Sequence, residues 1–116
     1  MATSAEWHED YERMSEAALN FSRAVKSVQE ELEAVDWYNQ RAQATKDDHL
    51  RRILEHNRDE EIEHAIMGLE YLRRMNKAFD EHMRTYLFTE GDITEIEEHA
   101  TTTPGPAAPS RPKNRG

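Results

Sequence analysis

The sequence predicts an all-α protein: an antiparallel two-helix hairpin plus a short C-terminal helix, with two copies dimerising into a four-helix bundle. Three observations predict this class. The first hundred residues are rich in Ala, Glu, Leu, Arg and Gln, which favour helices. No glycine precedes Gly68 and no proline precedes Pro104. Residues with β-branched side chains are scattered and never alternate with polar ones, so strand signals are absent.

The first helix is expected from about Ser15, or somewhat earlier, to Ala44. Its apolar residues recur at alternating steps of four and three, which is the spacing of a packing seam. They are Phe21, Val25, Val28, Leu32 and Val35.

The second helix is expected after a turn at residues 45–48, which also supplies a capping carboxylate. It runs from about Asp48 to Arg74, and continuation past Asn76 towards Leu87 is left open. Its seam holds Leu50, Leu54, Asn57, Glu61, His64, Gly68, Tyr71 and Met75. The short link makes the pair an antiparallel hairpin. Because two helices are too thin to cover both apolar faces, self-association is expected.

The C-terminal part of the chain changes character. Glu90-Gly91 ends the second helical region, and residues 92–95 have the capping-box spacing of a short third helix that ends near Ala100. All four prolines lie in residues 101–116, together with basic residues and no acid. The sequence therefore predicts a folded domain over residues 1–100 and a disordered tail over 101–116.

Composition excludes several classes of protein. The chain has 24 Asp plus Glu against 15 Lys plus Arg, a net charge of −9, which suits cations and argues against nucleic acid as a partner. It has no cysteine, which excludes disulfides, zinc knuckles and iron–sulfur clusters. No apolar run is long enough to span a membrane, and the acidic start is unlike a secretory signal.

A carboxylate and an imidazole, Glu61 and His64, lie on the seam of the second helix. Ionised groups on a packing seam cost several kcal/mol unless something compensates. Glu-x-x-His places both side chains on one helix face, where they can bind one metal ion. The motif alone is weak, because a chain this rich in Glu contains it by chance. Its position on the seam carries the prediction; the alternative is a polar pair that sets helix register.

Glu31 is a third candidate ligand. It lies as far before residue 46 as Glu61 lies after it, so the two are at nearly the same height in the hairpin. A di-iron carboxylate bundle needs a Glu from each of two helices and a Glu-x-x-His from each of the other two. One chain holds half of this set, and oxygen and nitrogen ligands suit Fe or Mn. The alternative for Glu31 is a solvated surface charge.

Three stretches resemble the encapsulated ferritins, which are ferritin-like proteins stored inside encapsulin shells. They are residues 30–38, 56–64 and 84–91, and with the spacing between them they cover roughly residues 25–98. The resemblance implies a ferritin-like bundle whose ferroxidase centre forms across a subunit interface, and dimers that assemble into a ring-shaped decamer. The centre would oxidise Fe²⁺ to Fe³⁺ with O₂, with two iron ions per dimer interface. Ca²⁺ or Zn²⁺ could substitute.

The resemblance also implies residue roles. The iron ligands and catalytic residues would be Glu31, Glu61 and His64, with Tyr38 close to the centre. An outer site on the way in would be formed by Glu30 and Glu33, with Trp37 nearby. Taken alone, these last three residues look like surface charge and packing.

The implied partners are further copies of the chain and an encapsulin shell protein, in a cytoplasmic nanocompartment that supports iron storage and detoxification. A two-helix chain has no room for mineral, so storage would depend on that container. The family usually ends in an apolar targeting peptide, and nothing like it follows Pro104; either the chain is truncated or its tag differs. Two rival functions stay open: a non-catalytic helical assembly module, and a di-metal protein with other O₂ or peroxide chemistry.

Overall fold

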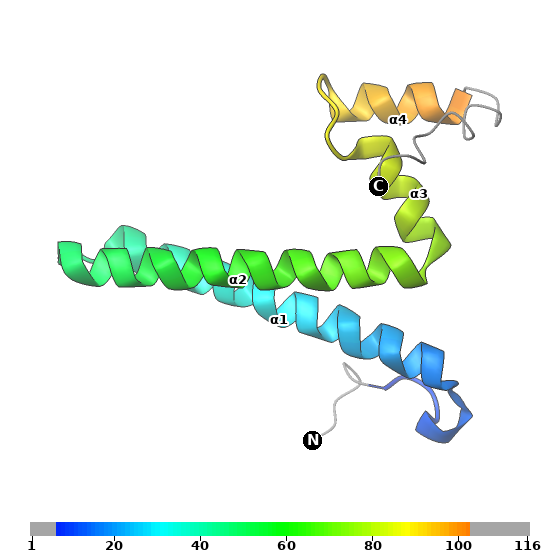
Figure 1. The fold of residues 1–116 in the computed structure, drawn as a ribbon, viewed down its shortest axis with the longest axis horizontal. Coiled ribbons are helices and arrows are strands. Elements are labelled where there is room, and N and C mark those ends of the chain that lie inside the picture. Colours follow the sequence, from blue (N-terminus) through cyan, green and yellow to red (C-terminus); the bar gives the residue numbers. More distant parts are fainter. Residues whose placement is uncertain (1–6, 103–116) are drawn as a thin grey trace. The chain divides into compact units, whose positions relative to one another are not determined.

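The computed structural model describes residues 7–102, and within that range every regular element is a helix (Figure 1). The prediction of an all-α chain built on an antiparallel hairpin is confirmed. The chain divides into two compact units, residues 1–75 and 76–116. Each unit is described by itself, and the grouping of residues 1–100 into one domain stays a prediction. The tail at 103–116 lies outside the described residues.

The first unit begins with a 3₁₀-helix, η1 (Tyr11–Arg13), and the long helix α1 (Glu16–Ala44). Trp7 packs edge-on against the ring of Tyr11, with centroids 5.2 Å apart. The side-chain oxygen of Ser15 accepts a hydrogen bond of 3.0 Å from the backbone N–H of Ala18. This N-cap satisfies one of the unpaired donors at the helix start, which is why α1 begins where the sequence predicts.

The turn between the two long helices is fixed by two short side chains. The Thr45 hydroxyl oxygen accepts from the Asp47 N–H at 3.2 Å. A carboxylate oxygen of Asp47 accepts from the Leu50 N–H at 3.0 Å and caps helix α2 (Asp48–Met75). The capping carboxylate predicted for this turn is therefore Asp47, and it favours an abrupt reversal of the chain.

The core of the first unit lies along the line where α1 and α2 run side by side (Figure 1). Its buried residues are Leu19, Val28, Ala42, Ala65 and Leu72. Other apolar side chains on these helices stay open; Leu32, on the predicted seam, is 53 % exposed. The hairpin thus buries one narrow strip and leaves further apolar surface for another molecule to cover, as its thinness predicts.

Gly68 lies at a close contact between the two helices. A Cβ atom at this position would lie 2.6 Å from Cγ2 of the buried Val28. Valine is stiff about χ1, so it cannot swing away without a shift of the backbone. A residue larger than glycine at position 68 would therefore force α1 and α2 to adjust at this contact.

We expect Gly68→Ala to lower the free energy of unfolding by about 1 kcal/mol. Overpacking costs about 1–3 kcal/mol, and the better helix propensity of alanine returns about 1 kcal/mol. Urea unfolding followed by circular dichroism would measure the change. In the double variant with Val28→Ala the clash is gone, so the two substitutions should not be additive. Additive effects would contradict the close contact.

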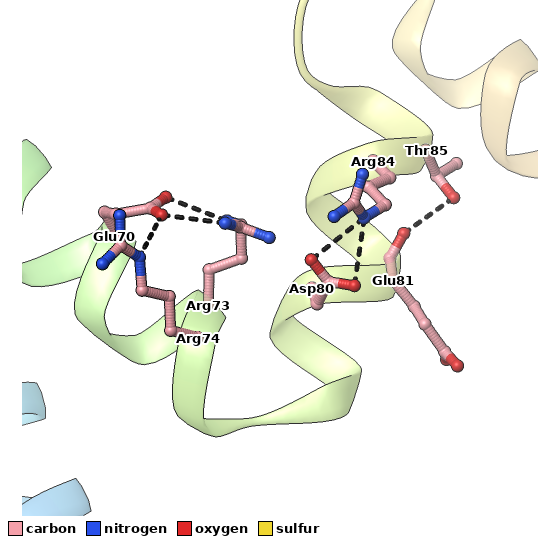
Figure 2. Close-up of polar contacts among 7 residues, drawn as sticks. All are labelled: Glu70, Arg73, Arg74, Asp80, Glu81, Arg84 and Thr85. Carbon is pink, nitrogen blue, oxygen red and sulfur yellow. Dashed lines mark hydrogen bonds and ion pairs between the residues drawn. The ribbon is translucent and has the colours of Figure 1, made fainter. Parts of the chain in front are cut away.

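An ion-pair cluster closes the C-terminal end of α2 (Figure 2). The Glu70 carboxylate accepts from Arg73 at 2.8 and 2.9 Å and from Arg74 at 2.7 Å. These hydrogen bonds, first that from Arg73, lower the pKa of Glu70 to about 2. Two guanidinium groups at a helix C-terminus also interact favourably with the helix dipole.

The lowered pKa of Glu70 predicts a pH-dependent contribution to stability. The carboxylate stabilises the folded state above its ordinary pKa of 4.5, and this contribution is lost as pH falls towards about 2. Glu70→Gln should therefore lower the melting temperature at pH 7, and the difference from the wild type should shrink at pH 2. Glu55→Gln removes the same charge from the same helix and is the control. An equal difference at both pH values would contradict the prediction.

The second unit contains two short helices, α3 (Lys77–Tyr86) and α4 (Ile93–Thr102). Continuation of the second helix past Asn76, which the sequence left open, is wrong. Asn76 adopts an extended backbone, and its side-chain oxygen accepts from the Phe79 N–H at 2.9 Å. An asparagine cap thus ends α2 at Met75 and starts α3. The predicted third helix is confirmed as α4.

The loop from α3 to α4 contains two residues with positive φ, Phe88 at 63° and Gly91 at 99°. Asp92 then accepts from the N–H and the hydroxyl of Thr94, at 2.8 and 2.6 Å. None of the described residues 76–101 is buried. No helix within the described range is long and apolar enough to cross a membrane.

Candidate metal centre

Glu31 of α1 meets Glu61 and His64 of α2 in the middle of the hairpin. One potential ligand atom from each residue lies within 4.8 Å of the others. The Nδ1 atom of His64 is 3.5 Å from Oε1 of Glu61 and 3.7 Å from Oε1 of Glu31. The structure thus brings together the three residues that sequence spacing placed at one height. Among residues 7–102, this is the one group of acids and histidines close enough to hold an ion.

The local fold explains why these three side chains meet. Glu61 and His64 are three residues apart on α2 and project from one face. One turn earlier, the guanidinium of Arg58 donates a 3.0 Å hydrogen bond to the side-chain oxygen of Asn39 on α1. This half-buried bond and the close contact at Gly68 lie on either side of the cluster along α2, and together they fix the register of the helices.

Two carboxylates at this separation disfavour their joint ionisation. The pKa of Glu31 is raised, first by a hydrogen bond with Glu61, then by burial and by repulsion from Glu61, while His64 opposes the shift. A cation would favour the ionised form of both acids and also accept the imidazole lone pair. The donor set of two carboxylates and one imidazole therefore fits a metal ion such as iron.

The site is open to solvent on one side. The exposed fraction of the side chain is 30 % for Glu31, 26 % for Glu61 and 46 % for His64. A closed metal site offers four or more protein ligands, whereas this chain offers three. If these three side chains bind a metal ion, they would leave part of its coordination shell to ligands from outside the hairpin.

The other predicted residues lie on α1, outside this three-residue cluster. Tyr38 is half-buried, and the guanidinium carbon of Arg41 lies 5.5 Å from the centre of its ring. Glu30 and Glu33 are exposed, and Trp37 is 50 % exposed. Their spacing along α1 places these last three residues on one helix face. The roles of Tyr38 and of the outer site stay predictions.

Sequence reasoning missed one feature of the surroundings and saw only part of another. The Arg58–Asn39 bond joins residues whose pairing depends on helix register, which sequence spacing gives only to within about a turn. Glu60 lies between two histidines, with oxygens 3.8 Å from Nε2 of His56 and 4.0 Å from Nε2 of His64. The spacing of four residues indicates His56 and Glu60 as neighbours in a peripheral site, and the next step of four, to His64, is the signal that completes the row.

Comparison with known proteins places the chain in a family. The sequence model of the family described as EncFtn-like matches residues 6–90. The chain belongs to the EncFtn-like family. The resemblance to encapsulated ferritins is thereby confirmed.

Two relatives and one solved structure illustrate the EncFtn-like match. An encapsulated ferritin-like protein of Rhodospirillum rubrum is 57 % identical over 84 % of this chain and 70 % of its own. A ferritin-like protein of Thermotoga maritima is 53 % identical over 83 % of this chain and 84 % of its own. The crystal structure of protein ne0167 from Nitrosomonas europaea matches with a TM-score of 0.73 at 50 % identity, over 75 % of this chain and 96 % of that one.

The carboxylate pair predicts that the metal-free site destabilises the fold at neutral pH. Because the pKa of Glu31 is raised in the folded state, its contribution to stability is present below the ordinary value of 4.5 and is lost as pH rises through the folded value. Glu31→Gln should therefore raise the melting temperature of chelator-treated protein at pH 7 and have little effect at pH 4. Glu33→Gln, on the exposed side of the same helix, is the control. A Glu31→Gln variant that is less stable than the wild type at pH 7 would contradict this account.

Proposed function

We propose that this chain is one half of a ferroxidase centre. Two copies would meet so that the Glu31, Glu61 and His64 clusters of both face each other and bind two Fe²⁺ ions, which O₂ oxidises to Fe³⁺. The observation that carries the proposal is the convergence of these three side chains, with ligand atoms within 4.8 Å. It is half of the ligand set of a di-iron carboxylate bundle.

The outward face of the cluster supports completion by a second copy. Two copies would together supply four carboxylates and two imidazoles. The three side chains of each copy are partly exposed, so the cluster of a second copy could approach them. The exposed apolar residues of the hairpin would be buried by the same association. Without cations the facing carboxylates would repel each other, so metal binding and assembly are coupled.

The ligand types suit oxidation of the bound substrate. Four carboxylates stabilise Fe³⁺ over Fe²⁺ because they offset the extra positive charge, and fixed positions set the separation of the two ions. The imidazole of His64 binds through a neutral nitrogen. Tyr38, on the same helix as Glu31, would act near the centre as a hydrogen-bond partner or electron donor.

The residues of the outer site would give Fe²⁺ a route to the centre. Glu30 and Glu33 are exposed carboxylates on one face of α1, with Trp37 beyond them on that face. They would bind Fe²⁺ transiently before it reaches the centre. The EncFtn-like family and its encapsulated ferritin-like member support a place inside an encapsulin shell, which would hold the ferric product.

The proposal is tested by metal content and Fe²⁺ oxidation. Glu31→Ala and His64→Ala should each lower iron in the purified protein and slow aerobic Fe²⁺ oxidation at least about tenfold, since metal-site substitutions typically cost about 10- to 100-fold. Elemental analysis and absorbance of the ferric product measure the two quantities. His49→Ala removes an exposed histidine at the start of α2 and is the control.

Oligomeric state gives an independent measure. Fe²⁺ should raise the molar mass of the wild type measured by light scattering, and the increase should be absent in His64→Ala. If His64→Ala leaves the metal content unchanged and only raises stability, the cluster is not a metal centre and the chain is an assembly module. If iron binds but Fe²⁺ is not oxidised, the site serves other di-metal chemistry.

A further inference from the structure

His64 presents its two ring nitrogens to different carboxylates. Its Nδ1 atom lies 3.5 Å from Oε1 of Glu61 and 3.7 Å from Oε1 of Glu31. Its Nε2 atom lies 4.0 Å from Oε1 of Glu60. A neutral imidazole carries one proton, on either nitrogen, and only the other nitrogen can bind a metal ion. The position of that proton therefore decides whether the ring can serve as a ligand in the three-residue cluster.

The cluster by itself would draw this proton to the wrong nitrogen. Ionised carboxylates only accept hydrogen bonds, so a neutral ring that faced Glu31 and Glu61 alone would be stabilised with its proton on Nδ1. That proton would occupy the lone pair that a metal ion between the three side chains has to use. An acceptor on the Nε2 side is needed to reverse the preference.

Glu60 is the acceptor on the Nε2 side. It precedes His64 by four positions on α2, which places both side chains on one helix face. The 4.0 Å between its Oε1 and Nε2 of His64 is longer than a hydrogen bond, but the Glu60 side chain is 49 % exposed and has room to rotate. Hydrogen bonds at functional sites are often long in free proteins and shorten when the site is filled.

His56 supports Glu60 from the other side. Its Nε2 atom lies 3.8 Å from Oε2 of Glu60, whereas it is Oε1 of Glu60 that lies near His64. Within residues 7–102, Glu60 makes no ion pair with lysine or arginine that would draw it away. The carboxylate is thus placed between two imidazoles, with one oxygen left for His64.

We propose that Glu60 is a positioning residue of the metal centre: it accepts the Nε2–H of His64 and so keeps the lone pair of Nδ1 directed at Glu31 and Glu61. This inference rests on the proposed function in that it assigns a metal ion to the cluster. Histidines that bind metals commonly donate their other N–H to a carboxylate, which fixes the ring and makes the binding nitrogen more basic. An exposed ion pair adds little to folding stability, so the effect of Glu60 falls on the site.

The position of the proton is measured by ¹⁵N NMR of the metal-free protein at alkaline pH, where imidazole is neutral. The spectrum of His64→Ala identifies the His64 signals. The proton should lie on Nε2 in the wild type and on Nδ1 in Glu60→Ala. Glu60→Gln keeps an oxygen that accepts a hydrogen bond and should retain the wild-type pattern. A wild-type ring with its proton on Nδ1, or an unchanged ring in Glu60→Ala, would overturn the proposal.

The consequence for binding is tested with Zn²⁺, which does not change its oxidation state. Glu60→Ala should weaken Zn²⁺ binding about tenfold in isothermal titration calorimetry, the lower end of the range for partners of metal-bound histidines. Glu60→Gln removes the charge alone, and Glu63→Ala removes an exposed charge next to His64 in the sequence. Both should stay within about twofold of the wild type, because salt screens exposed charges. Equal weakening in all three variants would mean that Glu60 acts only through its charge, against the proposal.

The number of bound ions separates positioning from direct ligation. If Glu60→Ala loses a whole Zn²⁺ ion while the His64 ring keeps its proton on Nε2, Glu60 is a ligand of another ion and the proposal is wrong. Neither measurement involves oxidation of iron. A wild type with the expected proton position and Zn²⁺ affinity that fails to oxidise Fe²⁺ would contradict the ferroxidase function and leave the role of Glu60 intact.

Discussion

The close contact between α1 and α2 at Gly68 and Val28 is the constraint on which the rest of the first unit depends. It brings the two helices close enough for side chains of α1 and α2 to contact each other. The Arg58–Asn39 bond fixes how far one helix is shifted along the other. A shift by one turn, about 5.4 Å, would separate Glu31 from Glu61 and His64. The potential metal site is therefore a product of register, and register is a product of packing.

The same contact explains why polar groups occupy a seam that is otherwise apolar. In a thick bundle, two carboxylates and an imidazole at this position would be costly unless fully paired. Here the hairpin is thin and the three side chains are partly exposed, so water solvates them and lowers the free-energy cost of desolvation. The raised pKa of Glu31 is the part that remains. The fold thus tolerates two acids whose joint ionisation is unfavourable, and such perturbed groups are common at binding sites.

The hairpin and the three-residue cluster could be predicted from the sequence because both depend on long, regular spacing. Glu31 and Glu61 each lie fifteen positions from residue 46 in a short turn, which leaves little freedom in height, and the turn lies where Thr45 and Asp47 indicate. The break at Asn76 could not be decided, because asparagine favours the N-cap position and is still tolerated inside helices. Phe88 could not be anticipated at all, since its left-handed backbone is one that sequence rules assign to Gly or Asn.

A metal shell that is only half supplied by each chain, as proposed above, would change how the protein responds to a damaged copy. If the two halves must come from separate polypeptides, a cell that makes intact and altered chains together builds many mixed pairs, each with one unusable half. A defective gene product would then silence more centres than its own share, by capturing sound partners. The arrangement that would let so small a chain share a two-ion site would thus also make it vulnerable to dominant interference.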